Sequence, residues 1–225
     1  MDGIIFDIDG TLWDSTDPVA ASWNQAIREN SSLDLTIDAG TLSGLFGKTM
    51  TEIGNILFPG MPEEEKERLL TICMEQENLY LENHPGIFYN GVIETIKKLA
   101  EKYPLFIVSN CQCGYIEVTV RSGGLESYIR DHLCFGETQV PKGQTLRMLM
   151  DRNGLKDPVY VGDTQGDADA CREAGIPFIF AEYGSAVFPI SAGCSFKHFP
   201  IGSFCIFSVL KRLLLCGYPS AGQQP

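Results

Sequence analysis

Short apolar segments that alternate with helical stretches constrain this chain more than any other feature. Residues 3–8, 105–109, 158–162 and 177–181 are mostly apolar, and helical periodicity fills much of the chain around them. A strand that is apolar throughout is buried on both faces, as in a parallel sheet. The alternation therefore predicts an α/β fold with a Rossmann-like parallel sheet covered by helices on both sides. A further short strand is expected near residues 134–135.

One long stretch interrupts this alternation, because residues 17–83 have a wholly helical pattern. We expect Asp17 to cap the first of these helices, and Thr49 and Glu52 to form a capping box for a later one. The charged helix at 62–84 has one face that contains Leu69, Ile72, Cys73, Gln76 and Leu79. The predicted order is thus one strand, an all-helical insert, and then repeated strand–helix units.

The charge of the chain limits what it can bind. The 225 residues include 17 basic and 29 acidic side chains, for a net charge of −12. No basic excess is present to neutralise phosphates, so we expect no nucleic-acid partner. An anionic substrate would have to be attracted locally, by a metal ion or by a single well-placed lysine.

The cysteines and the first residues indicate a reducing compartment. The chain begins with neither a basic region nor a long apolar run, so we expect no secretory signal, a cytoplasmic location and no membrane partner. Cys111 and Cys113 lack the spacing of redox and zinc motifs, and most of the eight cysteines are expected to be small buried hydrophobic residues. The sequence leaves the oligomeric state open, with a monomer slightly favoured.

The last stretch differs from the rest. Residues 184–225 contain no acidic residue and three basic ones. Their apolar part, 201–210, is shorter than the roughly 20 residues that a membrane span needs. A final strand with a covering helix is the preferred interpretation. A helix at a membrane surface, or a tail replaced by a shift of reading frame, are the alternatives.

Acidic side chains follow the first predicted strand. Asp7 and Asp9 are two residues apart, so strand geometry lets both point to one site, and Gly10 permits a sharp turn beside them. Two carboxylates this close repel each other, and such a pair usually holds a divalent cation or shares a proton. The sequence therefore favours a site here over a purely structural turn.

Other polar residues follow later strands of the predicted sheet. Ser109 and Asn110 end one strand, and Asp163 and Asp167 follow another. Lys142 opens a helix, where the helix dipole disfavours a cation. Each residue alone could be a cap or a solvated side chain. Ligands of open α/β sheets bind at the carboxyl ends of the strands, so their joint occurrence there favours a site.

These residues resemble the four motifs of the haloacid dehalogenase superfamily. The motifs are the DxDGT sequence at 7–11, Ser109 after an apolar strand, Lys142 at a helix start, and GDxxxD ending at Asp167. The helical insert resembles the C1-type cap of that superfamily. The resemblance implies a catalytic core made of residues 1–15 and 85–225, with a helical cap at 16–84.

The resemblance also implies aspartyl-phosphate chemistry. Asp7 would be the nucleophile, and Asp9 would protonate the leaving oxygen and later activate water. Mg²⁺ would be held by the Asp7 carboxylate, the Asp9 backbone carbonyl and Asp163, with Asp167 in support. The transferring phosphoryl oxygens would be bound by Thr11, Ser109, Asn110 and Lys142.

The implied function is hydrolysis of a small phosphorylated metabolite by an enzyme similar to the phosphoglycolate phosphatases. An acid at position 9 favours phosphate monoesters over organic halides. A phosphomutase similar to β-phosphoglucomutase, and a regulatory protein without catalytic activity on this fold, are the alternatives. Lys48 is either a specificity residue that reaches the site from the cap or a solvated lysine at a helix start.

Overall fold

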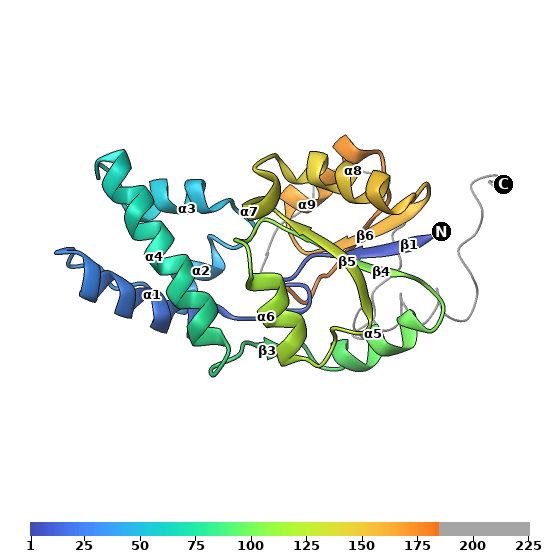
Figure 1. The fold of residues 1–225 in the computed structure, drawn as a ribbon, viewed down its shortest axis with the longest axis horizontal. Helices are drawn as coiled ribbons and strands as arrows, with labels where there is room; N and C mark the ends of the chain where they lie inside the picture. The colour runs from blue at the N-terminus through green and yellow to red at the C-terminus, as the bar shows by residue number, and fades with distance from the viewer. Residues whose placement is uncertain (185–225) are drawn as a thin grey trace.

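A five-stranded parallel sheet forms the centre of the molecule, which we describe for residues 1–184 from a computed structural model (Figure 1). The strand order is β5-β4-β1-β6-β7, and every neighbouring pair is parallel. The strands are β1 (Gly3–Phe6), β4 (Leu105–Ser109), β5 (Ile129–Cys134), β6 (Pro158–Gly162) and β7 (Phe178–Phe180). The prediction of an α/β parallel sheet is confirmed.

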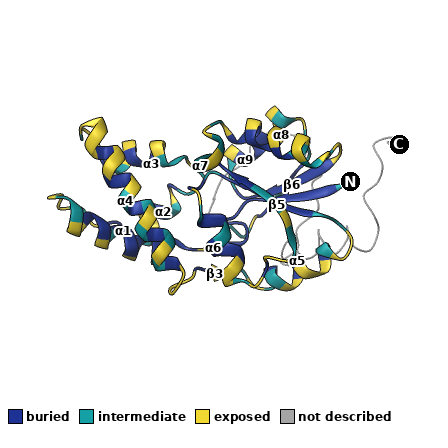
Figure 2. Cartoon of the chain, in the orientation of Figure 1, coloured by how far each residue is buried: buried dark blue, intermediate teal, exposed yellow. Residues whose placement is uncertain are grey.

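Helices cover both faces of this sheet. On one face lie α8 and α9, and on the other lie α5 and α6 (Figure 1). These helices, with the short α7, are α5 (Val92–Ala100), α6 (Tyr115–Ser122), α7 (Phe135–Thr138), α8 (Lys142–Asn153) and α9 (Gln165–Ala174). In β1, Ile5 packs toward the α8 and α9 face while Ile4 and Phe6 pack into the opposite cluster. Both faces of the central strands are therefore buried, which explains their continuous apolar sequence (Figure 2).

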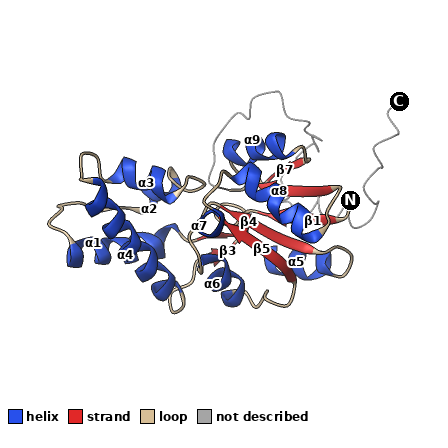
Figure 3. Cartoon of the chain, turned by 45° about the horizontal axis from the view of Figure 1, so that its top comes forward, coloured by secondary structure: helices blue, strands red, loops and turns tan. Residues whose placement is uncertain are grey.

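A second lobe is built from helices (Figure 3). It contains α1 (Thr16–Asn30), α2 (Ala39–Ser43), α3 (Met50–Leu57) and α4 (Glu63–Leu81), with α1 packed along α4. The chain enters this lobe through β2 (Trp13–Asp14) and leaves it through β3 (Ile87–Phe88). These two strands pair antiparallel, so the entering and leaving segments are held together beside the core. The capping box predicted at Thr49 and Glu52 is confirmed at the start of α3.

The strand expected near 134–135 is present as β5, which begins earlier, at Ile129. Two other local predictions were wrong. The first helix begins at Thr16, because the Asp14 carboxylate accepts hydrogen bonds from the Thr16 backbone N–H (2.9 Å) and hydroxyl (2.7 Å), so Asp17 is not its cap. On α4 the buried face runs through Cys73 and Glu77, while Leu79 is 65% exposed.

The tail predictions for residues 184–225 fall outside the described residues, apart from Gly184. Within residues 1–184, none of the helices combines the length and the apolar composition that crossing a bilayer requires.

Candidate active site

Three buried aspartates meet at the carboxyl edge of the sheet. Asp7 directly follows β1, Asp163 directly follows β6, and Asp167 lies in the first turn of α9. Each offers a carboxylate oxygen within 4.8 Å of the other two, and each side chain is at most 2% exposed. Burial raises the pKa of Asp7 well above its usual range, and the charges of Asp167 and Asp163 add to this. Strand ends separated by about 150 residues of sequence thus form one acidic cluster.

Lys142 partly neutralises this cluster. Its Nζ lies 3.1 Å from Asp7 Oδ1 and 2.6 Å from Asp167 Oδ1, at the start of α8. Burial alone would lower the pKa of Lys142, but the charges of Asp167 and Asp7 raise it overall, so the side chain stays protonated. The charge of Lys142 likewise lowers the pKa of Asp167 despite its burial. The lysine therefore contacts two of the three aspartates and favours the ionised form of Asp167.

The turn after β1 brings the backbone against Asp163. Gly10 has a φ of +77°, and a Cβ at this position would lie 2.1 Å from Asp163 Oδ2. Thr11 is fully buried, and its hydroxyl donates to Asp163 Oδ1 at 3.3 Å. Glycine is needed at position 10 for both the backbone conformation and the close approach. The Thr11 hydroxyl thus contacts Asp163, and its expected role in binding phosphoryl oxygens stays a prediction.

Asp9 has a different set of partners from Asp7. Its Oδ1 accepts hydrogen bonds from the Tyr115 hydroxyl (2.5 Å), the Ser15 hydroxyl (3.1 Å) and Trp13 Nε1 (3.2 Å). The Ser15 and Tyr115 hydroxyls are also 2.7 Å apart. Burial raises the pKa of Asp9 to about 6, against the lowering effect of these hydrogen bonds. The carboxylate is thus held in place and can exchange a proton near neutral pH.

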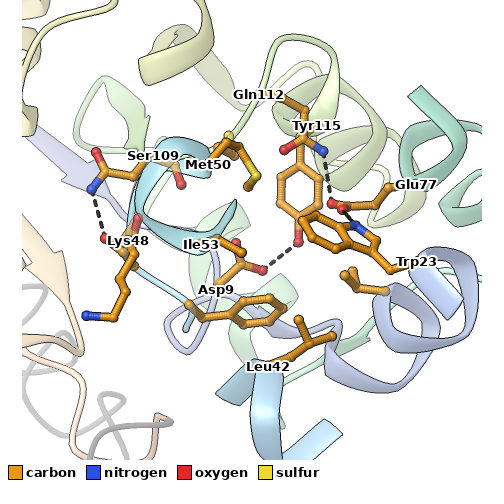
Figure 4. A pocket seen from close by; sticks show the side chains of 16 residues that line it. Asp9, Trp23, Leu42, Lys48, Met50, Ile53, Glu77, Ser109, Gln112 and Tyr115 are labelled. Atoms are coloured by element: carbon orange, nitrogen blue, oxygen red, sulfur yellow. Dashed lines mark hydrogen bonds between the residues drawn. The ribbon is translucent and has the colours of Figure 1, made fainter. Parts of the chain in front are cut away.

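A cavity beside Asp7 and Asp9 extends toward the helical lobe (Figure 4). Ser109 and Asn110 line it from the end of β4, and Lys48 lines it from the lobe. The Asn110 amide donates to the Gly47 carbonyl at 2.8 Å, which joins the core to the segment before α3. The structure therefore places Ser109, Asn110 and Lys48 at the cavity, while the hydrogen bond of Asn110 connects the two lobes.

The far end of the cavity contains a polar group that the sequence did not indicate. Glu77 of α4 is 3% exposed, and its carboxylate accepts hydrogen bonds from Trp23 Nε1 (2.5 Å) and Gln112 Nε2 (2.9 Å) (Figure 4). Burial raises the pKa of Glu77 to about 7. Gln112 and Tyr115 lie in the segment that follows β4. Glu77 is four residues after Cys73, so helical spacing places both on one face and could have indicated that Glu77 is buried. A glutamate on a charged helix is usually expected to be solvated, however.

The acidic cluster suits a hard divalent cation. Among residues 1–184, three buried carboxylates gather around one lysine, so the acidic groups of this cluster outnumber the basic ones. Carboxylate oxygens are the ligands that Mg²⁺ prefers, and a buried anionic cluster of this kind is stabilised by such an ion. Asp7 and Asp163 are the side chains that would hold Mg²⁺, with Asp167 beside them.

Comparison with known proteins identifies the family. The family profile of haloacid dehalogenase-like hydrolases matches residues 4–181. A phosphoglycolate phosphatase of Mesorhizobium japonicum is 28% identical over 192 residues, which cover 80% of this chain and 82% of that protein. A predicted phosphatase from Clostridium acetobutylicum has a TM-score of 0.74 at 16% identity, covering 95% of this chain and 98% of that one. A predicted phosphoglycolate phosphatase from Haemophilus somnus has a TM-score of 0.68 at 23% identity, covering 82% and 86%. The fold, the order of the motifs and the profile agree, and the chain belongs to the haloacid dehalogenase-like hydrolase family.

Proposed function

We propose that this protein is a Mg²⁺-dependent phosphatase that hydrolyses a small phosphomonoester through an aspartyl-phosphate at Asp7. Family membership and the phosphoglycolate phosphatases among its relatives support a phosphatase. In this proposal residues 16–84 act as a cap, and residues 1–15 and 85–225 form the catalytic core. The substrate would bind in the cavity between these two parts.

One observation carries the proposal. Asp7 and Asp9 line the same cavity, yet Asp7 contacts Lys142 while Asp9 contacts Tyr115. The two carboxylates therefore have separate environments and can perform separate tasks, one as nucleophile and one as acid and base. A structural cation site alone would not need the second carboxylate, with a pKa of about 6, facing the cavity.

The first step transfers the phosphoryl group to Asp7. An Asp7 carboxylate oxygen attacks phosphorus, the bond from phosphorus to the ester oxygen breaks, and protonated Asp9 gives its proton to that oxygen. In the second step, ionised Asp9 takes a proton from water, whose oxygen attacks phosphorus and releases the Asp7 carboxylate. Inorganic phosphate and an alcohol are the products, and both aspartates regain their starting states.

The remaining residues would bind the charged phosphoryl group or hold its ligands in position. Lys142 and Ser109 would bind phosphoryl oxygens near Asp7, which the Lys142–Asp7 contact and the position of Ser109 at the cavity support, and Asn110 joins the cap segment to the core. Bound Mg²⁺ would supply further neutralisation of the phosphoryl charge. Thr11 and Asp167 hold their neighbours Asp163 and Lys142 in position.

The test is phosphate release from p-nitrophenyl phosphate and a panel of small phosphomonoesters, with Mg²⁺ and with EDTA. We expect release that requires Mg²⁺ and falls by at least about a thousandfold in Asp7→Asn. Asp151→Asn, an exposed aspartate on α8, is the matched control and should keep the wild-type rate. Release that persists in Asp7→Asn would contradict the proposal. Formation of an isomeric ester in place of free phosphate would favour a phosphomutase instead.

A further inference from the structure

Two buried hydrogen-bond acceptors lie together at the end of the cavity away from Asp7. Glu77 and Gln112 are 3% and 6% exposed, and both line the cavity that also contains Asp7 and Asp9. Glu77 comes from the helical lobe and Gln112 from the segment after β4 (Figure 4). A small substrate that reaches Asp7 would therefore have its remaining part near these two side chains.

The orientation of the Gln112 amide is fixed by its neighbours. Its Nε2 donates to Glu77 Oε1 at 2.9 Å and to Asn78 Oδ1 at 3.1 Å. Both partner atoms accept, so the amide cannot be turned around without losing both bonds. Gln112 Oε1 is then a buried acceptor that no donor of the described residues satisfies. An unmet acceptor of this kind costs about 1–3 kcal/mol, which a donor on a ligand would recover.

At pH 8, above the Glu77 pKa of about 7, the charge at this end of the cavity is negative. Both carboxylate oxygens of Glu77 accept hydrogen bonds from N–H groups, which stabilise the ionised form. Among the described residues that line the cavity, Lys48 is the one cation, and it lies on the opposite side from Glu77 and points away from it (Figure 4). A carboxylate on a substrate would meet a like charge and an acceptor here, whereas a hydroxyl or ammonium group could donate to both residues.

We propose that Glu77 and Gln112 select phosphomonoesters whose far end donates hydrogen bonds, and that they reject esters with a carboxylate at that end. The inference rests on the proposed function only for the position of the phosphate at Asp7. It sets this protein apart from its relatives named for phosphoglycolate, whose substrate carries a carboxylate. Sites built to pair with substrate polar groups discriminate strongly against an analogue that leaves those groups unpaired.

The test compares esters that share a skeleton. We would measure binding by calorimetry at pH 8 with Mg²⁺, using the Asp7→Asn variant so that no ester is consumed. The two-carbon set is 2-hydroxyethyl phosphate, 2-aminoethyl phosphate and 2-phosphoglycolate. The three-carbon pair is glycerol phosphate and 3-phosphoglycerate. Glu77→Gln and, as its matched control, Glu65→Gln are added on the same background, since Glu65 is exposed on the same helix.

We expect a hydroxyl or ammonium ester to bind at least about tenfold more tightly than the matching carboxylate ester. Glu77→Gln should bring this ratio toward one, chiefly by strengthening binding of the carboxylate ester, and Glu65→Gln should leave it unchanged. The better of the hydroxyl and ammonium esters identifies the donor. Equal or tighter binding of the carboxylate esters, a ratio that Glu77→Gln does not alter, or no binding of any ester would overturn the inference. Selective binding without phosphate release by the wild type would contradict the proposed function and leave the specificity assignment intact.

Discussion

The two ends of the cavity are built in different ways. At the core end, Asp7 follows a strand and lies beside Asp163, which follows another strand, and Lys142, which begins a helix. The parallel sheet determines where these strand ends meet. At the lobe end, Glu77 and Gln112 meet only because α4 packs beside the segment after β4. In our proposals the charges of the core end carry out the chemistry, and the acceptors of the lobe end recognise the ester. The positions of the core-end residues can be inferred from the sheet topology. The positions of the lobe-end residues depend on how the helical lobe packs against the core.

The largest expected effect is at the core end, from loss of Lys142, the cation that contacts the acidic cluster in the described part of the chain. Lys142→Met leaves Asp7 and Asp167 buried without a counter-charge, and we expect it to lower the free energy of unfolding by about 3–5 kcal/mol in EDTA. Added Mg²⁺ should restore part of the loss. Urea unfolding measures both effects, with Lys98→Met on the exposed side of α5 as the control. A variant that unfolds at the wild-type urea concentration would show that the cluster is not held by this lysine.

At the lobe end the expected effect depends on pH. The pKa of Glu77 is about 7 in the fold against 4.5 for an ordinary glutamate, so the folded chain binds its proton more tightly than the unfolded chain. Stability from this group is therefore present below pH 4.5 and lost as pH rises through 7, by about 3 kcal/mol in total. Urea unfolding between pH 5 and 8 in EDTA should show wild type losing stability relative to Glu77→Gln. Parallel pH curves for the two proteins would contradict the buried position of this carboxylate, and Glu65→Gln should follow the wild type.

A smaller effect is expected between the two ends, at Asp9. Tyr115→Phe removes a donor to the Asp9 carboxylate, and that hydrogen bond lowers the pKa of Asp9. The pKa should therefore rise by about one unit above 6. Asp9 must be protonated to assist the leaving oxygen, so the alkaline limb of kcat/KM for an alkyl phosphate should move upward. Tyr103→Phe, a half-buried tyrosine before β4, should keep the wild-type profile. An unshifted limb would show that Tyr115 does not control this proton.

Much of the core end could be predicted from the sequence because strand ends carry a strong local signal. An apolar strand followed by acids fixes which edge the acids occupy, so the sequence alone is enough to place Asp7 and Asp163 together. The family resemblance rested on the motifs at these strand ends, and the α/β fold was predicted from the alternation of apolar and helical segments. Gly10 could be predicted as a turn residue, although the position of Asp163 against it could not.

The rest depends on contacts between distant segments. Glu77 and Tyr115 resemble ordinary residues of amphipathic helices, and only tertiary packing turns them toward the cavity. Helical periodicity assigns Leu79 to the apolar face of α4, but α1 packs on a neighbouring face of α4 that contains Cys73. Leu79 is therefore exposed. The helix α1 begins before Asp17 for a local reason, since the Asp14 carboxylate accepts the hydrogen bonds of the Thr16 backbone N–H and hydroxyl. Site residues in a helical insert, which has no strand ends, are thus the hardest to predict from the sequence.

The central claim is that Asp7 accepts the phosphoryl group while the rest of the cavity recognises the ester. The most direct measurement is acid quenching of the wild-type protein during turnover of a phosphomonoester with Mg²⁺, followed by peptide mass spectrometry. The account predicts a phosphoryl group on the peptide that contains Asp7, and none on that peptide in Asp7→Asn. Turnover with the phosphoryl group on another residue such as Ser109, or with no phosphorylated peptide under any quench time, would contradict it.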